Sequence, residues 1–191
     1  MRRPAFTRRV AVTGLGIISP VGSTIAGAWD NIVAGNSGLQ RITRWDPEVT
    51  PCHAAGEVND FEPKDWMDFK AVRRTDKNVV FGVAAAKQAV ADAGLLIDAD
   101  NAADIGVIFG SGVGGPSLMH DAMATFATKG PKSVSPFFIA NMLPDTASGQ
   151  IAIETGAIGH NVCIVSACAT GTHNIGEGAE AIRRGDCIAV I

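Results

Sequence analysis

Three apolar segments of this 191-residue chain alternate with segments whose apolar residues recur at helical spacing, and this alternation limits the available folds. The apolar segments are residues 105–109, 161–165 and 188–191. Residues 8–18 are also apolar and β-branched, and they predict a buried first strand. Strands connected through helices pair mainly in parallel and are covered by those helices. The sequence therefore predicts an α/β fold with a mixed, mainly parallel sheet and helices on both faces.

The predicted helices follow from periodic apolar residues and from their caps. They are residues 24–34 behind the Ser23–Thr24 cap, 76–93 before Gly94, 117–128, 144–154, and 168–184 before Gly185. The remaining long segments, 36–74 and 133–138, are expected to be loops. Within the first of these we expect a short strand at 54–58 and a short helix after Pro63.

Composition excludes two classes of function. The net charge is −3, whereas a general nucleic-acid binder carries a strong basic excess. The chain has no uncharged apolar run of about 18 residues, so no transmembrane helix is expected. The basic N-terminus is followed by residues 10–18, in which Thr13, Gly14 and Gly16 interrupt the apolar run that a signal peptide needs. We expect a cytoplasmic protein.

The four cysteines form no C-x-x-C pair, so a zinc site is not expected. Cys163 and Cys187 fall in predicted strands and are expected in the core. Cys52 is followed by His53, but two potential ligands in a proline-rich loop do not make a metal site. We expect reduced thiols and neither metal nor cofactor.

Cys168 is placed differently, after an apolar strand and at the start of a predicted helix. The free N–H groups and the dipole at a helix N-terminus favour the thiolate, which is the form that attacks carbonyl groups. The backbone N–H of Cys168 could also help to hold an oxyanion. His173 lies about 140° around the helix from Cys168, so it is not expected to act as its base. A free cysteine can also be a small buried hydrophobe, and geometry alone leaves both interpretations open.

The helix after Cys168 contains three glycines, each of which costs about 1 kcal/mol relative to alanine in a helix interior. Gly171, Gly176 and Gly178 therefore predict close packing or the close approach of a substrate. Ile175, Ala179 and Ile182 are expected to form an apolar stripe on this helix, and the last predicted strand begins soon after it. Because domains rarely end inside an apolar strand, we expect that the chain is truncated at Ile191.

Several sequence blocks together resemble the β-ketoacyl-[acyl-carrier-protein] synthases, especially their type II elongating enzymes. The blocks are VAVTGLGIISPVG, AGEVNDFEP, RRTDKNVVFGVAAAKQAVADAGL, IGVIFGSGVGG, KGPKSVSPFFIANMLPDTASGQIAIETGAIGHN and SACATGTHNIG. The resemblance covers nearly the whole chain. It implies a thiolase-like fold, of which residues 1–191 would be the N-terminal half. The complete fold is a five-layered αβαβα sandwich, usually in a homodimer.

The resemblance also implies an activity and a set of site residues. Acyl-loaded carrier protein would transfer its chain to Cys168, and malonyl-loaded carrier protein would then lose carbon dioxide and attack the thioester. Val113 and Phe138 match positions that line the acyl pocket near the dimer contact. Lys70, Arg73 and Arg74 match the carrier-protein dock and form a basic cluster suited to an acidic partner. An ordinary solvated charged face is the alternative for these three cations.

The family's two catalytic histidines, a nearby lysine and a loop that completes the oxyanion hole belong to the C-terminal half. We therefore expect this fragment alone to be unable to catalyse condensation. A polyketide-type ketosynthase is the alternative function. A nucleotide-binding module is a remote one, because Gly14-x-Gly16 follows the first predicted strand but Ser19 occupies the third glycine position.

Overall fold

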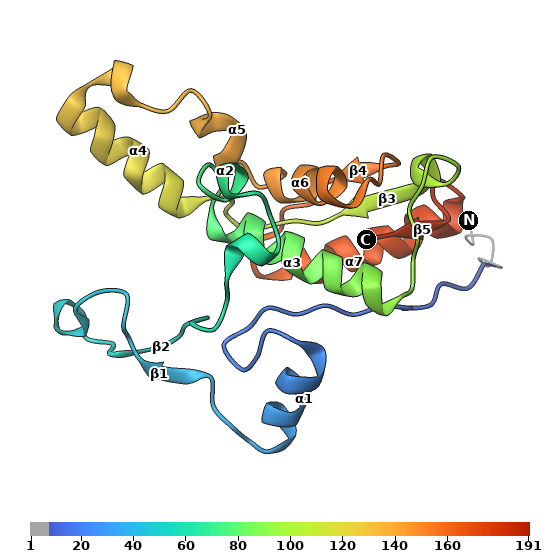
Figure 1. The fold of residues 1–191 in the computed structure, drawn as a ribbon, viewed down its shortest axis with the longest axis horizontal. Helices are drawn as coiled ribbons and strands as arrows, with labels where there is room; N and C mark the ends of the chain where they lie inside the picture. The colour runs from blue at the N-terminus through green and yellow to red at the C-terminus, as the bar shows by residue number, and fades with distance from the viewer. Residues whose placement is uncertain (1–7) are drawn as a thin grey trace, which may run out of the picture.

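The computed structural model describes residues 8–191, so Arg2 and Arg3 of the basic N-terminus lie outside the described residues. Its centre is a parallel sheet with the strand order β4-β3-β5 (Figure 1). The strands are β3 (Ile105–Ile108), β4 (Asn161–Val162) and β5 (Ala189–Val190). The mainly parallel sheet predicted from the strand–helix alternation is confirmed.

The register of the sheet is fixed on both sides of β3, which is its middle strand. Val107 lies opposite Asn161 on β4, and Ile105 lies opposite Ala189 on β5. All four residues of β3 are buried. Its apolar run therefore occupies the centre of the fold, as a strand covered on both faces requires.

Seven α-helices connect or extend these strands within the described residues. They are α1 (Ile25–Val33), α2 (Phe69–Val72), α3 (Lys77–Asp92), α4 (Pro116–Lys129), α5 (Phe138–Met142), α6 (Thr146–Thr155) and α7 (Thr170–Arg184). Short 3-10 turns occupy Pro47–Val49, Pro63–Asp65, Ala102–Asp104, Pro131–Ser133 and Ala167–Ala169. Predicted caps are present, since Thr24 Oγ1 accepts a hydrogen bond from the Gly27 N–H, and Gly185 ends α7 with φ +86°.

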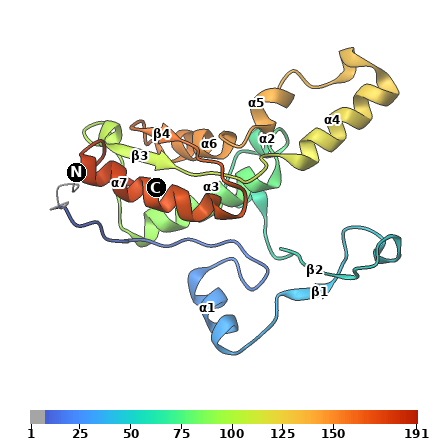
Figure 2. The same ribbon diagram turned by 180° about the vertical axis from the view of Figure 1, so that it is seen from behind.

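Helices cover both faces of the sheet, as predicted. Ile105 and Val107 belong to a core cluster with Val80 and Val83 of α3 and Ile151 of α6. The other face carries α7, which lies behind α3 in Figure 1 and in front of it in Figure 2. This two-sided cover leaves the carboxyl ends of β3 and β4 as the edge from which the glycine-rich and cysteine segments emerge.

The predicted first strand at residues 8–18 is wrong, because no strand is assigned in this extended segment. Its N–H groups bond to side chains of α3 instead, from Leu15 to Asp92 Oδ2 at 2.9 Å and from Ile17 to Gln88 Oε1 at 3.3 Å. Gly14 allows this approach, because a Cβ there would lie 2.1 Å from the carbonyl oxygen of Ala89. Contacts with the helix therefore replace a strand ladder.

A second, two-stranded antiparallel sheet pairs β1 (Leu39–Arg41) with β2 (Ala54–Gly56). Only β2 was predicted. Figure 1 shows this hairpin and α1 projecting away from the central sheet, in blue and cyan. The hairpin is closed by Glu57, which is buried and accepts hydrogen bonds from the N–H and hydroxyl of Thr43 and from the N–H of Arg44.

Two further predictions need correction. The strand predicted at 161–165 ends at Val162, because both backbone groups of Ile164 bond to the side chain of Asn174 rather than to a neighbouring strand. The helix α5, which begins at the end of the loop predicted at 133–138, was missed. It spans five residues and has no side-chain cap, so no sequence signal marks its start.

Candidate functional site

Cys168 lies in the short turn that joins β4 to α7, where the strand-to-helix pattern predicted it. The turn is a 3-10 segment over Ala167–Ala169, and Cys168 is exposed. Ala167 is left-handed, with φ +51°, and among the described residues it is the only non-glycine with positive φ. An exposed thiol at a helix start, on a strained backbone, is a common arrangement for a nucleophile.

His173 does not serve the thiol directly. Its Nδ1 lies 2.6 Å from Ser166 Oγ, on the strand side of the turn. This contact is consistent with the helical spacing, which predicted that His173 and Cys168 occupy different faces. The contact adds a link between the turn and the first part of α7.

A glycine-rich loop, residues 110–115, packs against the cysteine turn. A Cβ on Gly110 would lie 2.6 Å from the Ile164 carbonyl oxygen and 2.7 Å from Asn174 Nδ2. A Cβ on Gly112 would lie 3.3 Å from the Ala167 carbonyl oxygen. Only glycine at position 110 therefore allows the loop to lie this close to the turn.

The far end of the same loop contacts the end of α5. The N–H of Gly115 donates to the Met142 carbonyl at 2.8 Å, and Gly114 has φ +89° and lies against the same oxygen. Val113, at the tip, is 73% exposed, and Phe138 is half-buried one turn before Met142. One loop thus brings the segments that carry the two predicted acyl-pocket residues to the turn that carries Cys168.

Asp76 ties this loop to the start of α3. Its buried carboxylate accepts from the Lys77 N–H at 2.7 Å through Oδ1 and from the Leu118 N–H at 3.0 Å through Oδ2. The N-termini of α3 and α4 therefore share one carboxylate, which their dipoles favour.

The predicted basic cluster is assembled on and just after α2. Lys70, Arg73 and Arg74 are exposed and, with Phe69, line a surface hollow of about 290 Å³. The guanidinium of Arg73 lies 5.7 Å from the centroid of the Phe69 ring. That of Arg74 lies 4.4 Å from the Phe137 ring, next to the predicted pocket residue Phe138. The structure therefore brings the cluster into contact with the segment that precedes α5.

Of the three glycines of α7 for which close packing or the approach of a substrate was predicted, only Gly178 is closely packed within the described residues. A Cβ on Gly171 or Gly176 would meet no atom within 4 Å, whereas one on Gly178 would lie 3.3 Å from Val190. The buried residues of the helix are small or polar, and they are Thr170, Asn174, Gly178 and Ala181. This face of α7 is buried because it contacts β5 and the cysteine turn, and not because it is the most apolar face.

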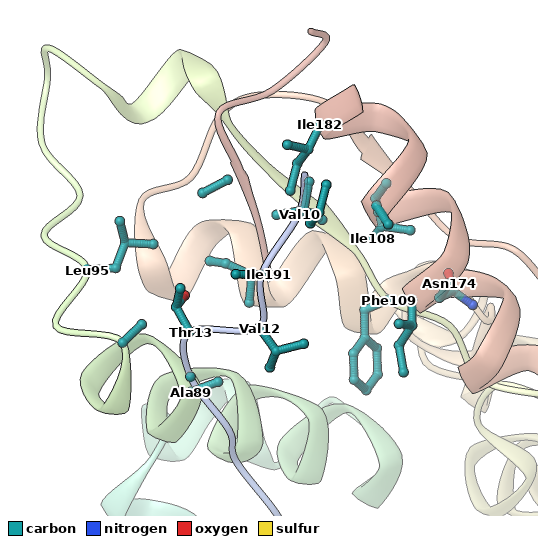
Figure 3. Close-up of a pocket in the computed structure, with 18 of the residues that line it drawn as sticks. Val10, Val12, Thr13, Ala89, Leu95, Ile108, Phe109, Asn174, Ile182 and Ile191 are labelled. Atoms are coloured by element: carbon teal, nitrogen blue, oxygen red, sulfur yellow. The ribbon is translucent and has the colours of Figure 1, made fainter. Parts of the chain in front are cut away.

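The predicted apolar stripe of α7 faces a cavity of about 520 Å³ instead (Figure 3). Residues 10–14, α3, α7 and the ends of β3 and β5 line it, and Val10, Val12 and Ile182 lie around it in Figure 3. Ile175, another lining residue, is 74% exposed. Cys168, Val113 and Phe138 are not among the described residues that line this cavity, so it is distinct from the predicted acyl site.

The other three cysteines are also free thiols. Cys187 is buried, as predicted, but Cys163 lies beyond the end of β4 and is only half-buried. Partial burial raises the pKa of the Cys163 thiol, although a hydrogen bond with the Ser111 backbone opposes the shift. Cys52 is exposed.

Residues 8–191 contain neither a metal-binding cluster nor a membrane-spanning helix. Over these residues, no group of three or more histidine, cysteine, aspartate or glutamate side chains is placed to hold a metal ion. In the same range, no helix has the length and apolar character needed to span a membrane.

Two residues of the site were missed by sequence reasoning. Thr170 and Asn174 are buried one helical turn apart and bond to the backbone of the cysteine turn. Their spacing of four residues, which places two polar side chains on one helical face, was a signal that could have identified them.

Comparison with known proteins places this geometry in context. Residues 7–191 match the sequence family described as the β-ketoacyl synthase N-terminal domain. The chain is 43% identical to 3-oxoacyl-[acyl-carrier-protein] synthase 2 of Staphylococcus aureus strain COL over 184 residues. This alignment covers 96% of this chain and 44% of that protein. The chain therefore spans less than half the length of this curated relative.

Solved structures agree on the fold. The ishigamide ketosynthase/chain length factor is 28% identical, with a TM-score of 0.81 over 92% of this chain and 44% of that one. A type II PKS ketosynthase, solved in complex with its acyl-carrier protein and bound to a hexaketide, is 21% identical, with a TM-score of 0.78 over 92% of this chain and 47% of that one. These similarities confirm the predicted fold class, the N-terminal half of a thiolase-like fold.

Proposed function

Because this chain belongs to the family of β-ketoacyl synthase N-terminal domains, we propose that its protein elongates fatty acids by condensing acyl-loaded with malonyl-loaded carrier protein. The carbon–carbon bond forms as malonyl carbon dioxide is lost, and the growing chain is held meanwhile as a thioester on Cys168. The observation that carries the proposal is the exposed Cys168 thiol at the strand-to-helix turn, next to Ala167, which lies against Gly112 of the glycine-rich loop.

The first half-reaction uses groups of this chain. The Cys168 thiolate attacks the thioester carbonyl of the acyl carrier protein, the carrier's thiol leaves, and the acyl group is retained on Sγ. The loop segment around Val113 and the α5 segment around Phe138 supply apolar surface for that chain. In the second half-reaction the carbanion formed by decarboxylation attacks the acyl carbonyl and releases Cys168.

We also propose a carrier-protein dock at Lys70, Arg73 and Arg74. These exposed cations line one hollow, beside the segment that leads to Phe138. A positive patch attracts an acidic carrier protein and speeds its association. The type II PKS ketosynthase solved in complex with its acyl-carrier protein is consistent with such a partner.

A homodimer is the proposed assembly, with the arm formed by α4 and α5 at its contact. Met123, Phe126 and Ile139 on this arm are each more than half exposed, and exposed apolar patches are typical of interfaces. Sedimentation of the complete gene product tests this assignment. A Phe126→Glu variant is expected to shift a dimer toward monomer, and a protein that is monomeric before substitution would overturn it.

The extent of the domain and the cellular location belong to the same proposal. Residues 1–191 match an N-terminal domain and span 44% of a curated relative. We propose that a C-terminal half supplies the groups that stabilise the decarboxylation intermediate, and that the enzyme acts in the cytoplasm. Purified residues 1–191 should then form no β-ketoacyl product, and robust turnover by them would reject this division.

Polyketide elongation is the second candidate, and it is favoured by one observation, the similarity to a type II PKS ketosynthase. Fatty-acid elongation is preferred because the curated relative named as a 3-oxoacyl-[acyl-carrier-protein] synthase is 43% identical, against 21% for the PKS structure. Product analysis separates the two. Saturated acyl donors extended by a single two-carbon unit support the first, and repeated extension without reduction supports the second.

The decisive experiment is intact-mass analysis after the complete gene product is incubated with acyl-loaded carrier protein. We expect one added acyl mass, which a Cys168→Ala variant abolishes. Cys52→Ala is the matched control, because it removes another exposed thiol and should leave acylation unchanged. An acyl adduct that survives Cys168→Ala would refute the assignment of the nucleophile.

A further inference from the structure

Asn174 holds the two ends of the cysteine turn together through its side-chain amide. Nδ2 donates to the Ile164 carbonyl at 2.8 Å and to the Thr170 carbonyl at 2.7 Å, while Oδ1 accepts from the Ile164 N–H at 3.1 Å. Ile164 precedes the turn and Thr170 begins α7. One amide therefore spans the segment that carries Cys168 and uses both its donor and its acceptor atoms.

Thr170 adds a second tie inside the same segment. Its Oγ1 accepts from the Ser166 N–H at 2.9 Å. Thr170 and Asn174 are 4% and 5% exposed, so water competes little for either set of hydrogen bonds. A buried network in which every bond is made fixes one geometry, because each broken bond would leave a polar group unpaired.

The surroundings of this amide require it to be placed accurately. Gly110 of the glycine-rich loop lies against Asn174 Nδ2 and the Ile164 carbonyl, where even a Cβ would clash. Between the two tied ends, Ala167 is held at φ +51°, a conformation that alanine adopts only when its surroundings impose it. The Asn174 amide, the glycine-rich loop and the strained Ala167 therefore hold the backbone of the cysteine turn together.

We infer that Asn174 is a positioning residue for Cys168, which sets the backbone of the turn and so the place and direction of the thiol. Figure 3 shows its side chain at the start of α7, near Phe109 at the end of β3. Asn174 does not itself meet the acyl donor. This inference rests on the proposed function, since it concerns the acceptance of an acyl group by Cys168.

Three variants of the complete gene product test the role. Asn174→Ala removes all three hydrogen bonds. Asn174→Asp preserves the shape and the acceptor but removes both donated bonds. Asn161→Ala is the control, because Asn161 Nδ2 also donates to a backbone carbonyl, that of Ser148 at 3.1 Å, away from the turn.

The principal measurement is acylation of Cys168 by acyl-loaded carrier protein, followed by intact mass at increasing donor concentration. A small misplacement of a reacting atom can cost up to about a hundredfold in rate, so we expect both Asn174 variants to lose about tenfold or more at saturation. The half-saturating concentration should stay unchanged, because Asn174 lies away from the dock. Asn161→Ala should change neither quantity. An Asn174→Asp rate equal to wild type would overturn the inference, since the residue would then only fill space.

A second measurement separates this inference from the proposed function. Alkylation of Cys168 by iodoacetamide, normalised to Cys52 in the same molecules by peptide mapping, requires no acyl transfer. We expect the ratio to fall about tenfold in Asn174→Ala, toward its value in urea, because the turn no longer holds the thiol in its exposed position at the start of α7. If Cys168→Ala still becomes acylated, the proposed function fails while this ratio still reports on Asn174.

Poor folding of Asn174→Ala would not prevent the test. Thr170→Val keeps the branched shape and removes only the acceptor for the Ser166 N–H. We expect a smaller loss in the same two measurements, with the half-saturating concentration again unchanged. Unchanged acylation in folded Asn174→Asp overturns the positioning role of Asn174 by itself, and unchanged acylation and alkylation in folded Thr170→Val would exclude Thr170 from it.

Discussion

The guanidinium of Arg74 lies 4.4 Å from the centre of the Phe137 ring. The contact joins the proposed carrier-protein dock to the segment that leads into α5 and Phe138. An arginine over an aromatic face contributes about 0.5–1 kcal/mol at an exposed site. Arg74 therefore has two roles that substitution can separate, a positive charge for the partner and a stacking contact within the chain.

Arg74→Ala removes both roles, whereas Arg74→Lys keeps the charge and weakens the stacking. We expect Arg74→Ala to raise the half-saturating concentration of acyl carrier protein about fivefold at low salt, as a loss of ~1 kcal/mol would. Arg74→Lys should raise it less, and added salt should reduce the difference. Lys64→Ala, another exposed cation outside the hollow, is the control. Equal affinities for Arg74→Ala and wild type would exclude Arg74 from the dock.

Glu57 predicts a pH-dependent opening of the β1–β2 hairpin. The Thr43 hydroxyl, which donates to the carboxylate at 2.6 Å, is the main reason that the pKa of Glu57 is lowered from its ordinary value of 4.5. A lowered pKa in the folded state stabilises the hairpin above the unfolded pKa, and this contribution is lost as pH falls through the folded value. We expect the amide resonances of Thr43 and Arg44 to titrate below pH 4.5.

Thr43→Val provides the matched variant for this titration, since it removes the hydroxyl and keeps the shape. The pKa of Glu57 should rise toward its ordinary value, and the hairpin should open at a higher pH. A wild-type titration centred at or above 4.5 would contradict the assigned hydrogen bonds.

Lys87 and Glu154 join α3 to α6 across the core. Lys87 Nζ lies 2.6 Å from Glu154 Oε2 and donates to the Trp66 carbonyl at 2.5 Å. The Lys87 and Glu154 side chains are half-buried, 32% and 21% exposed, so removing one partner leaves a partly desolvated charge without its ion pair. We expect Lys87→Met to lower the free energy of unfolding by about 1–3 kcal/mol. Chemical denaturation measures this loss, with Lys77→Met, an exposed lysine of the same helix, as control.

The double variant Lys87→Met/Glu154→Gln distinguishes the ion pair from other effects of the substitution. If the ion pair is the cause, the losses of unfolding free energy in the single variants Lys87→Met and Glu154→Gln should sum to more than the loss in the double variant. Strict additivity would indicate that Lys87 stabilises the fold through Trp66 and packing alone.

Local sequence patterns were sufficient to predict the elements whose stability is local. The helix α3 has periodic valines and the predicted stop at Gly94, and β3 is an apolar run bounded by polar residues and glycine. The start of α7 after Cys168 follows from the strand, the small-residue turn and the helix pattern. The position of Cys168 could therefore be predicted without knowledge of its neighbours.

Tertiary contacts decided what the sequence could not predict. Residues 8–18 have a strand pattern, but Asp92 and Gln88 of α3 bond their N–H groups. The buried face of α7 runs through Thr170 and Asn174 because the cysteine turn offers backbone partners there, while Ile175 remains exposed. These hydrogen bonds and buried faces depend on contacts between residues far apart in the chain, and the periodicity of apolar residues gives no information about such contacts.

Cys163 is expected to react slowly with iodoacetamide. Partial burial raises its pKa, and the nearby charge of Asp145 raises it further. At neutral pH less of this thiol is therefore ionised, and alkylation should be slower than at exposed Cys52. Asp145→Asn should accelerate the reaction at Cys163, with the remote Asp186→Asn as control. Peptide mapping over time measures both rates, and faster labelling of Cys163 than of Cys52 would contradict the assigned burial.

Because Ala167 is strained, we expect Ala167→Gly to keep or raise the free energy of unfolding and to lower the rate of acylation. A left-handed conformation costs an L-residue about 1–2 kcal/mol, and replacing alanine by glycine costs about 0.5–1 kcal/mol in chain entropy. At φ +51° the relief of strain should offset the entropy, so Ala167→Gly is expected to keep or raise the free energy of unfolding. Acylation of Cys168 should slow, because glycine makes the turn more mobile.

Ala169 offers the matched control for Ala167, since it lies two residues away in the same turn with φ −87°. Glycine there relieves no strain, so Ala169→Gly should lower the free energy of unfolding by about 0.5–1 kcal/mol. Chemical denaturation of the two variants, side by side with their acylation rates, measures both effects. If Ala167→Gly destabilises the protein as much as Ala169→Gly does, the turn does not store the strain that its backbone angle indicates, and the surroundings of Cys168 hold it by hydrogen bonds alone.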